Sequence, residues 1–345
     1  MNPIYRIEKG SGVGIICCSD GRKREKTEAL SSGTEVGART ECDLELRSLL
    51  EKLESLGLQP QLSPCVSAQN GVSAGSGRQR AQALMDFYRD DSIKAIFDIS
   101  GGNAANEVLP FLDYSVIAGT DKLFWGYSDL TVILNAVYAK TGKASVLWQI
   151  RNLLYDHGEE QKTALEEALS ESARDCGTGD GNGEKAENEA AKADALFSFP
   201  FHFINSSRME GVVAGGNLRC LLKLAGTEFW PDMRGKLLLL ESRSGGGALI
   251  ASGLAQLEQM GVFRQISGLL LGTFTELEGS VPGAEERLAA LVREHAGPEL
   301  PVAKTQRIGH GTDSAAVLIG GGMRLENGRP VLKRPGPAGS VHGPV

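Results

Sequence analysis

The chain has 345 residues, 41% of them hydrophobic and 23% charged, so it can bury a sizeable core, and two domains are expected. Its net charge of -7 at pH 7 argues against a nucleic-acid partner, because phosphate binding needs a basic face. No apolar run reaches the roughly 18 residues that a membrane span needs, and the stretch 13–18 is too short for a signal sequence, which favours a cytoplasmic location.

Strands and helices alternate through the first part of the chain. Strands are expected at 12–18, 58–64, 93–99 and 122–125, and helices at 41–56, 76–91, 104–112 and 129–140. This alternation predicts an open, mostly parallel α/β sheet, and we place an N-terminal domain at residues 1–165.

A polar segment separates this domain from a second one. Residues 161–174 have a helical pattern, and 177–190 are rich in Gly, Asp, Asn and Glu without apolar periodicity, which is typical of a loop or linker. We place the linker at 166–205 and a second α/β domain at 206–345.

The C-terminal domain is expected to alternate in the same way. Strands are predicted from 208, at 236–240 and at 266–274, helices at 251–260 and 284–295, and a closing hairpin at 323–332 with Asn327-Gly328 as its turn.

Several familiar sites are not supported. Gly10 to Gly14 precede and enter a strand instead of following it, so the dinucleotide fingerprint is rejected. The six cysteines have no C-x-x-C spacing and the five histidines no H-x-x-x-H pair. We therefore expect no disulfide framework, no metal and no cofactor.

The stretch 122–142 is the most informative. A buried strand end is followed by Gly126, which permits a sharp turn, then by Ser128 and a helix that Gly142 stops. Strand, tight turn and helix with a serine at the turn is the geometry of a nucleophile elbow, in which backbone N–H groups point at the oxyanion. The second glycine of G-x-S-x-G is missing, and the alternative is that Ser128 or Asp129 only caps the helix.

Paired glycines followed by asparagine occur twice. Gly101 and Gly102 follow the strand 93–99, where ligands bind in parallel sheets, and can bring backbone N–H groups close to a substrate. Asn103 and Asn217 stand beside the two pairs as candidates for substrate contact. Plain turns and loop caps are the alternatives.

A serine nucleophile needs a base and an orienting acid. Among the histidines only His310 lies between two glycines in a turn after an apolar stretch. Glu241 directly follows a four-leucine strand, where a charge is costly unless it is paired. The alternatives are a hydrogen-bonded turn histidine and a solvated glutamate.

The sequence resembles the LD-carboxypeptidase family, which includes muramoyltetrapeptide carboxypeptidases and microcin C self-immunity proteins. The resemblance covers residues 12–322 and depends on the joint order of its motifs. They are Gly101-Gly-Asn-Ala-Ala-Asn-Glu-Val-Leu-Pro-Phe-Leu-Asp113, Phe124-Trp-Gly-Tyr-Ser-Asp-Leu-Thr131, Gly215-Gly-Asn-Leu218, Leu238-Leu-Leu-Glu241, Gln256-Leu-Glu-Gln-Met-Gly-Val-Phe263, Leu271-Gly-Thr-Phe274 and Ile308-Gly-His310.

The resemblance implies a serine peptidase of peptidoglycan recycling with Ser128, Glu241 and His310 as its triad. It also implies an active site in the cleft between two α/β domains, with the serine on the first and the other two residues on the second, and a homodimer. The N–H groups of Asp129 and of the Gly101-Gly102 turn would bind the oxyanion.

Two departures leave the substrate open. Cell-wall carboxypeptidases usually carry Asp-Arg where this chain has Ala251-Ser252, and His-Gly-Pro where it has Trp148-Gln149-Ile150. The substrate is expected to be a murein tetrapeptide that releases D-alanine, or alternatively a peptidyl-nucleotide or acyl-amide conjugate. A non-catalytic α/β binding module is the remaining alternative.

Overall fold

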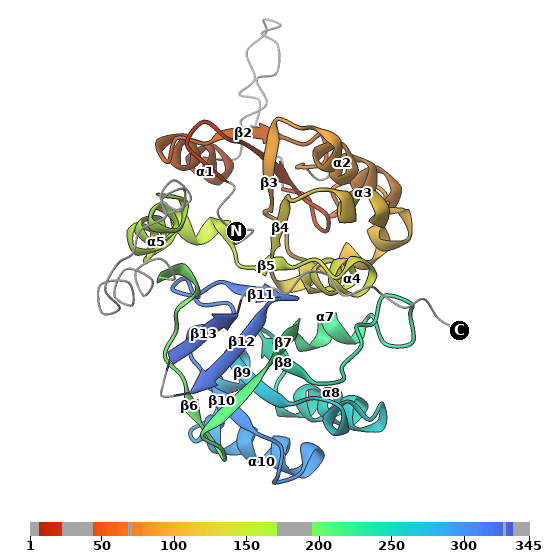
Figure 1. The fold of residues 1–345 in the computed structure, drawn as a ribbon, viewed down its shortest axis with the longest axis vertical. Coiled ribbons are helices and arrows are strands. Elements are labelled where there is room, and N and C mark those ends of the chain that lie inside the picture. Colours follow the sequence, from red (N-terminus) through yellow and green to blue (C-terminus); the bar gives the residue numbers. More distant parts are fainter. Residues whose placement is uncertain are drawn as a thin grey trace, which may run out of the picture.

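In a computed structural model of the chain, residues 7–22, 44–67, 69, 71–170, 195–326 and 329–333 are described. They form two α/β units, each built on its own sheet, which lie one above the other in Figure 1. The predicted fold class, a mostly parallel N-terminal sheet domain with a second α/β domain, is confirmed. No helix within the described residues is long and apolar enough to cross a membrane.

The N-terminal sheet has the strand order β11-β5-β4-β3-β1-β2. Its strands are β1 Gly12–Ile16, β2 Gln59–Leu62, β3 Ile93–Asp98, β4 Leu123–Gly126, β5 Ser145–Leu147 and β11 Val317–Ile319. Strands β1 to β5 are parallel, whereas β11 pairs with β5 in the antiparallel sense. Strands β1 and β4 are buried along their whole length, as expected for parallel strands covered on both faces.

Local signals mark ends of helices α2 and α4 in this unit. They are α1 Leu44–Ser55, α2 Gly77–Arg89, α3 Tyr114–Gly119, α4 Thr131–Thr141 and α5 Gly158–Ser170, with 3₁₀ turns η2 Ala105–Phe111, η3 Ser128–Leu130 and η4 Ile150–Leu154. Ser76 and Gln79 form a capping box at the start of α2. Gly142 ends α4 in the left-handed conformation, with φ of +69°.

Some predicted elements differ from the structure. The expected helix 104–112 is the 3₁₀ helix η2, which contains Pro110, a residue without the N–H that an α-helix requires. The helix expected at 129–140 begins as the 3₁₀ turn η3 and becomes α-helical only at Thr131. Residues 171–194, which hold most of the predicted linker and its polar stretch, and the turn Asn327-Gly328 lie outside the described residues.

The C-terminal sheet has the order β13-β12-β7-β8-β9-β10-β6. Its strands are β6 His202–Phe203, β7 Arg208–Asn217, β8 Lys236–Ser242, β9 Gly268–Phe274, β10 Val302–Lys304, β12 Gly322–Glu326 and β13 Arg329–Lys333. Strands β7 to β10 are parallel, and β12 and β13 form the predicted antiparallel hairpin. The helical segments are η6 Ala195–Phe197, α7 Leu218–Leu222, α8 Gly247–Gln259, η7 Val262–Arg264, α9 Thr275–Ser280 and α10 Ala284–Ala296.

The two units are held together by a shared strand and by hydrogen bonds between helix α4 and strand β7. Strand β11 comes from the C-terminal part of the sequence but completes the N-terminal sheet (Figure 1). Helix α4 packs on β7, where the Asn135 side chain exchanges two 2.8 Å hydrogen bonds with the backbone of Gly215. The Thr131 hydroxyl also accepts the Asn217 N–H at 3.0 Å. The elbow helix is therefore fixed to the second unit.

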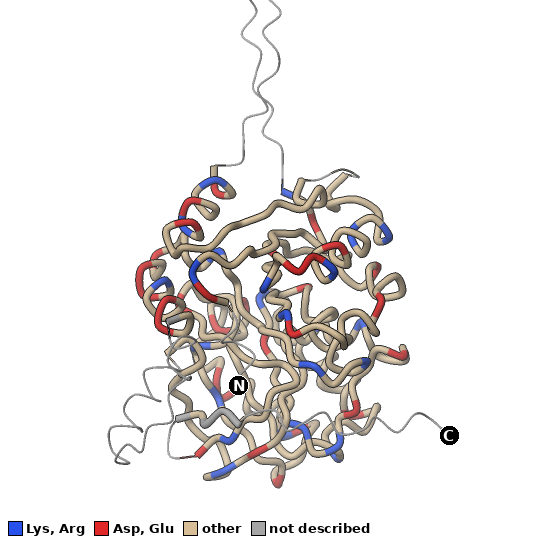
Figure 2. The backbone as a smooth tube through the Cα atoms, turned by 45° about the horizontal axis from the view of Figure 1, so that its top comes forward, with Lys and Arg blue, Asp and Glu red and all other residues tan. Residues whose placement is uncertain are grey.

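Charges are spread over both units. Figure 2 shows Lys and Arg interspersed with Asp and Glu along the described backbone.

Candidate active site

Ser128 occupies a strained turn directly after β4. Its φ is +57°, and it is the one non-glycine residue with positive φ among the described residues. Such a conformation costs about 1–3 kcal/mol and is concentrated at functional sites. A methyl group on Gly126 would lie 2.7 Å from Leu130 Cβ, so the tight return of the chain requires glycine there. This is the strand–turn–helix arrangement expected of an elbow.

Three predicted residues from two sheets meet at this turn. His310 Nε2 lies 3.1 Å from Ser128 Oγ, and His310 Nδ1 lies 2.8 Å from Glu241 Oε2. The side chains of His310 and Glu241 are 4% and 2% exposed. With the proton on Nδ1, the imidazole donates to Glu241 and its Nε2 is free to accept the serine proton.

Glu241 is held inside strand β8 instead of following it. Its second carboxylate oxygen, Oε1, accepts a 2.9 Å hydrogen bond from Asn217 Nδ2. The Asn217 Oδ1 atom accepts the Cys220 N–H at 3.3 Å and so caps α7. The side chain of Asn217 is thus directed at Glu241 and at its own helix. It acts as a helix cap, the alternative to substrate contact that the sequence left open.

The His310 loop is packed closely against this carboxylate. Gly309 has φ of +140°, and a methyl group there would lie 2.0 Å from Thr273 Oγ1 and 3.4 Å from Glu241 Oε2. The Tyr127 ring packs against the imidazole at a tilt of 57°, with 4.6 Å between ring centroids, and burial raises the pKa of the Tyr127 hydroxyl above the usual range. The imidazole is therefore fixed on two sides.

The Asp129 carboxylate points into the protein. It is fully buried and accepts hydrogen bonds from the Ser19 hydroxyl at 2.7 Å, from the Ala105 N–H at 2.8 Å and from Lys223 Nζ. Burial alone would raise its pKa, but these donors, Lys223 above all, outweigh it and the pKa is lowered. The side chain thus anchors the turn, and the role predicted for Asp129 concerns its backbone N–H.

The Gly101-Gly102 turn borders open space on one side. A methyl group on Gly101 would meet no atom within 4 Å, whereas one on Gly102, where φ is +130°, would lie 2.3 Å from the Asp20 carboxylate. Asn103 is engaged by the second unit, because its side-chain oxygen accepts from Arg219 and its carbonyl accepts from Lys223 at 2.9 Å. The Asn103 side chain therefore already has a partner within the protein.

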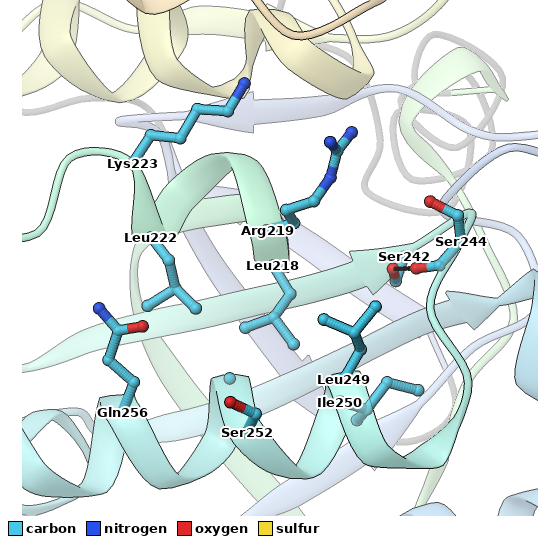
Figure 3. Close-up of a pocket in the computed structure, with 11 residues that line it drawn as sticks. Leu218, Arg219, Leu222, Lys223, Ser242, Ser244, Leu249, Ile250, Ser252 and Gln256 are labelled. Carbon is cyan, nitrogen blue, oxygen red and sulfur yellow. Dashed lines mark hydrogen bonds between the residues drawn. The ribbon is translucent and has the colours of Figure 1, made fainter.

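A cavity of about 350 Å³ lies between α7 and α8, next to the end of β8 (Figure 3). None of Ser128, Glu241 and His310 lines it, although Ser242 does. Its lining residues are Leu218, Arg219, Leu222, Lys223, Ser242, Ser244, Leu249, Ile250, Ser252, Gly253 and Gln256. Within the described part of the chain, no group of three or more His, Cys, Asp or Glu side chains is arranged to hold a metal ion.

Comparison with known families agrees with this arrangement. Residues 13–147 match the LD-carboxypeptidase N-terminal domain, and residues 210–325 match the LD-carboxypeptidase C-terminal domain. The chain belongs to the LD-carboxypeptidase family. It is therefore a peptidase of this serine peptidase family, as the sequence motifs indicated.

Individual relatives cover nearly the whole chain. The probable murein peptide carboxypeptidase of Bacillus subtilis is 30% identical over 311 residues, 86% of this chain and 89% of that protein. The microcin C7 self-immunity protein in complex with glutamyl sulfamoyl guanosine is 18% identical, with a TM-score of 0.72 over 95% of this chain and 98% of that one. The muramoyltetrapeptide carboxypeptidase of Oxalobacter formigenes is 21% identical, with a TM-score of 0.67 over 93% and 98%. The two structures establish a shared fold.

Sequence reasoning did not identify several residues around the site. Tyr127 precedes the serine but was not assigned a role, and Ser19, Arg219 and Lys223 carried no motif of their own. The one available signal for Lys223 was its position six residues after Asn217, at the end of a short helix. Its partner Asp129 comes from the other unit, and no local pattern predicts such a pairing.

Proposed function

We propose that the protein is a metal-independent serine carboxypeptidase that cleaves an amide bond near a peptide C-terminus, with Ser128, His310 and Glu241 as its catalytic triad. The observation that supports this most strongly is the continuous hydrogen-bonded chain from Ser128 Oγ through His310 to Glu241, at 3.1 and 2.8 Å. These distances are those at which a base activates a nucleophile and an acid orients the base.

The reaction follows from the roles of the three side chains. Ser128 Oγ attacks the carbonyl carbon while His310 Nε2 takes its proton, and the imidazolium then gives this proton to the leaving amine. Glu241 keeps the tautomer with Nδ1–H and stabilises the imidazolium. In the second half of the reaction, His310 Nε2 takes a proton from water as the water attacks the acyl carbon. The imidazolium then gives this proton to Ser128 Oγ, which frees the serine.

The negative charge on the carbonyl oxygen needs fixed donors. In this proposal they are the Asp129 N–H, at the start of the 3₁₀ turn that leads into α4, and an N–H of the Gly101-Gly102 turn. The buried Asp129 carboxylate accepts the Ala105 N–H, which links the serine turn to the start of η2, three residues after Gly102. Each donor is expected to contribute about 10²–10³ in rate.

The proposed substrate is an L,D-tetrapeptide of murein that releases D-alanine. Two of the compared proteins are named murein peptide or muramoyltetrapeptide carboxypeptidases. The second candidate is a peptidyl-nucleotide conjugate, because the self-immunity protein was solved with an aminoacyl sulfamoyl nucleoside. Both substrates present an amide-like acyl bond to the same triad.

Turnover of the two substrates separates these candidates. Purified protein is incubated with the tetrapeptide and with a glutamyl sulfamoyl nucleoside, and released D-alanine and free nucleoside are quantified. The proposal expects a higher kcat/KM for the tetrapeptide. Preference for the nucleoside conjugate would overturn the murein assignment and leave the triad in place.

The assembly and location stay predictions. The family resemblance predicts a homodimer, which light scattering would detect as twice the chain mass of 36.7 kDa. The cytoplasmic location likewise stays a prediction.

A further inference from the structure

Helix α7 lies at the junction of the two units and contacts both halves of the proposed site. Its N-terminal cap, Asn217, donates to Glu241. Two cations, Arg219 and Lys223, extend from the same helix away from Ser252 and Gln256 of α8, toward the N-terminal unit (Figure 3).

Lys223 joins two separate turns of the N-terminal unit. Its Nζ atom donates to the Asp129 carboxylate and, at 2.9 Å, to the main-chain carbonyl of Asn103. Arg219 adds a hydrogen bond from its guanidinium to the Asn103 side-chain oxygen. The Asp129 side chain is fully buried and that of Lys223 is 20% exposed, so solvent and salt screen this ion pair only weakly.

Both contacts lie beside the groups that the proposed function uses. Asp129 directly follows Ser128 and carries one proposed oxyanion donor, and Asn103 directly follows the glycine pair that carries the other. Donors of this kind act only when they are held within about 0.5 Å of the productive position. A side chain that fixes both turns at once therefore controls their spacing.

We propose that Lys223 is a positioning residue that holds the two oxyanion turns together across the domain junction, with Arg219 in a supporting role. The inference rests on the proposed function. It predicts that the two oxyanion donors reach their working positions only when Lys223 of α7 contacts both turns.

The test is the rate at which a fluorophosphonate labels Ser128. Ser128 Oγ bonds to phosphorus, fluoride leaves, His310 accepts the serine proton, and the phosphoryl oxygen takes the place of the oxyanion. In Lys223→Gln this rate and the peptide kcat should fall about 10–100-fold with KM unchanged, less than the roughly 10²–10³ lost when one oxyanion donor is removed outright. Lys223→Arg, which keeps the charge and donors, should recover most of the rate.

Lys140→Met is the matched control. Lys140 on α4 pairs with Glu228 of the C-terminal unit at 2.7 Å, so it also bridges the junction, but it contacts neither turn. Labelling of Lys140→Met should stay within about twofold of wild type, because such exposed pairs contribute little. Thermal melting of each variant reports whether it folds. The exposed Arg219→Ala, which removes the hydrogen bond to Asn103 and should slow labelling less than Lys223→Gln, provides a second variant if Lys223→Gln does not fold.

The outcomes separate the inference from the proposed function. Wild type that is not labelled at Ser128 would contradict the proposed function itself. Wild type that is labelled, with Lys223→Gln labelled as fast as Lys140→Met, would overturn the inference alone. If only Arg219→Ala can be measured, labelling of this variant at the wild-type rate would likewise overturn the inference.

Discussion

Asn217 shows how a single side chain serves the acid of the site and the helix beside it. Its amide nitrogen donates to Glu241 Oε1 and its oxygen caps α7. A buried carboxylate needs such donors, because an unpaired charge away from water is costly. The residue therefore supports the orientation of Glu241 without a direct part in the chemistry.

Asn217→Ser separates the two tasks. Serine caps a helix about as well as asparagine, so helix α7 should still form, but the donor to Glu241 is lost. We expect kcat to fall about tenfold with KM unchanged. Steady-state kinetics decides the point, since a raised KM with unchanged kcat would show instead that Asn217 contacts the substrate.

Asp129 makes stability depend on acid. Its folded-state pKa is lowered, so its contribution is fully present above the unfolded value of about 3.9 and is lost as the pH falls through the folded value. Urea unfolding from pH 7 to pH 2.5 should therefore show a shallower loss of stability in Asp129→Asn than in wild type below about pH 4. If the free energy of unfolding fell equally with pH in the two proteins, this role of Asp129 would be contradicted.

Among the elements, β7 and α4 determine how the two units meet. The glycine pair Gly215 and Gly216 lies within β7, with φ of +110° and +129°. A methyl group on Gly216 would lie 2.8 Å from Thr131 Oγ1 of α4. The pair thus allows the strand and the elbow helix to approach closely.

Gly216→Ala should destabilise the protein by about 1–3 kcal/mol through backbone strain alone, with an added cost from the displaced helix. Gly235→Ala is a suitable comparison, because Gly235 also has positive φ, +67°, but a methyl group there meets no atom within 4 Å. Urea denaturation of both variants measures the difference. Equal destabilisation would mean that contact with Thr131 has no influence.

Prediction from the sequence was most successful where one residue pattern determines one element. The buried strands β3, β8 and β9 each contain a continuous apolar run. Helices α2 and α10 have apolar residues at helical spacing and clear end signals. The three-residue strands β5 and β11 were missed, because so few residues carry no period and their pairing is made by distant parts of the chain. Ser128 and His310 stood out by their glycine neighbours, whereas Lys223 depends on a tertiary contact that no spacing reveals.

On the scale of the whole molecule, the two units are bound into one structure. Strand β11 completes the N-terminal sheet from the C-terminal part of the chain, and one continuous group of buried apolar side chains includes residues of both sheets. Unfolding one unit would therefore strip the other of a strand and of buried surface. The proposed site needs both units, since its serine and its histidine come from different ones.

A single cooperative unfolding transition is the expected consequence. Two of the three tryptophans belong to the N-terminal unit, Trp125 within β4 and Trp148 directly after β5, so tryptophan fluorescence is weighted toward that unit, while far-ultraviolet circular dichroism reports on both units. The two urea curves should coincide in midpoint and slope. Two separated midpoints would contradict the coupling inferred from β11 and α4.

The role of Ser128 as nucleophile is tested most directly by comparing wild type, Ser128→Ala and Ser115→Ala on whichever of the two candidate substrates wild type cleaves faster. Ser115 lies on the exposed surface of α3 and controls for loss of a hydroxyl. We predict that Ser128→Ala lowers kcat by about 10⁶-fold while Ser115→Ala leaves it unchanged. Cleavage by Ser128→Ala within about tenfold of wild type would contradict this role, because that turn would then be strained for a reason other than catalysis.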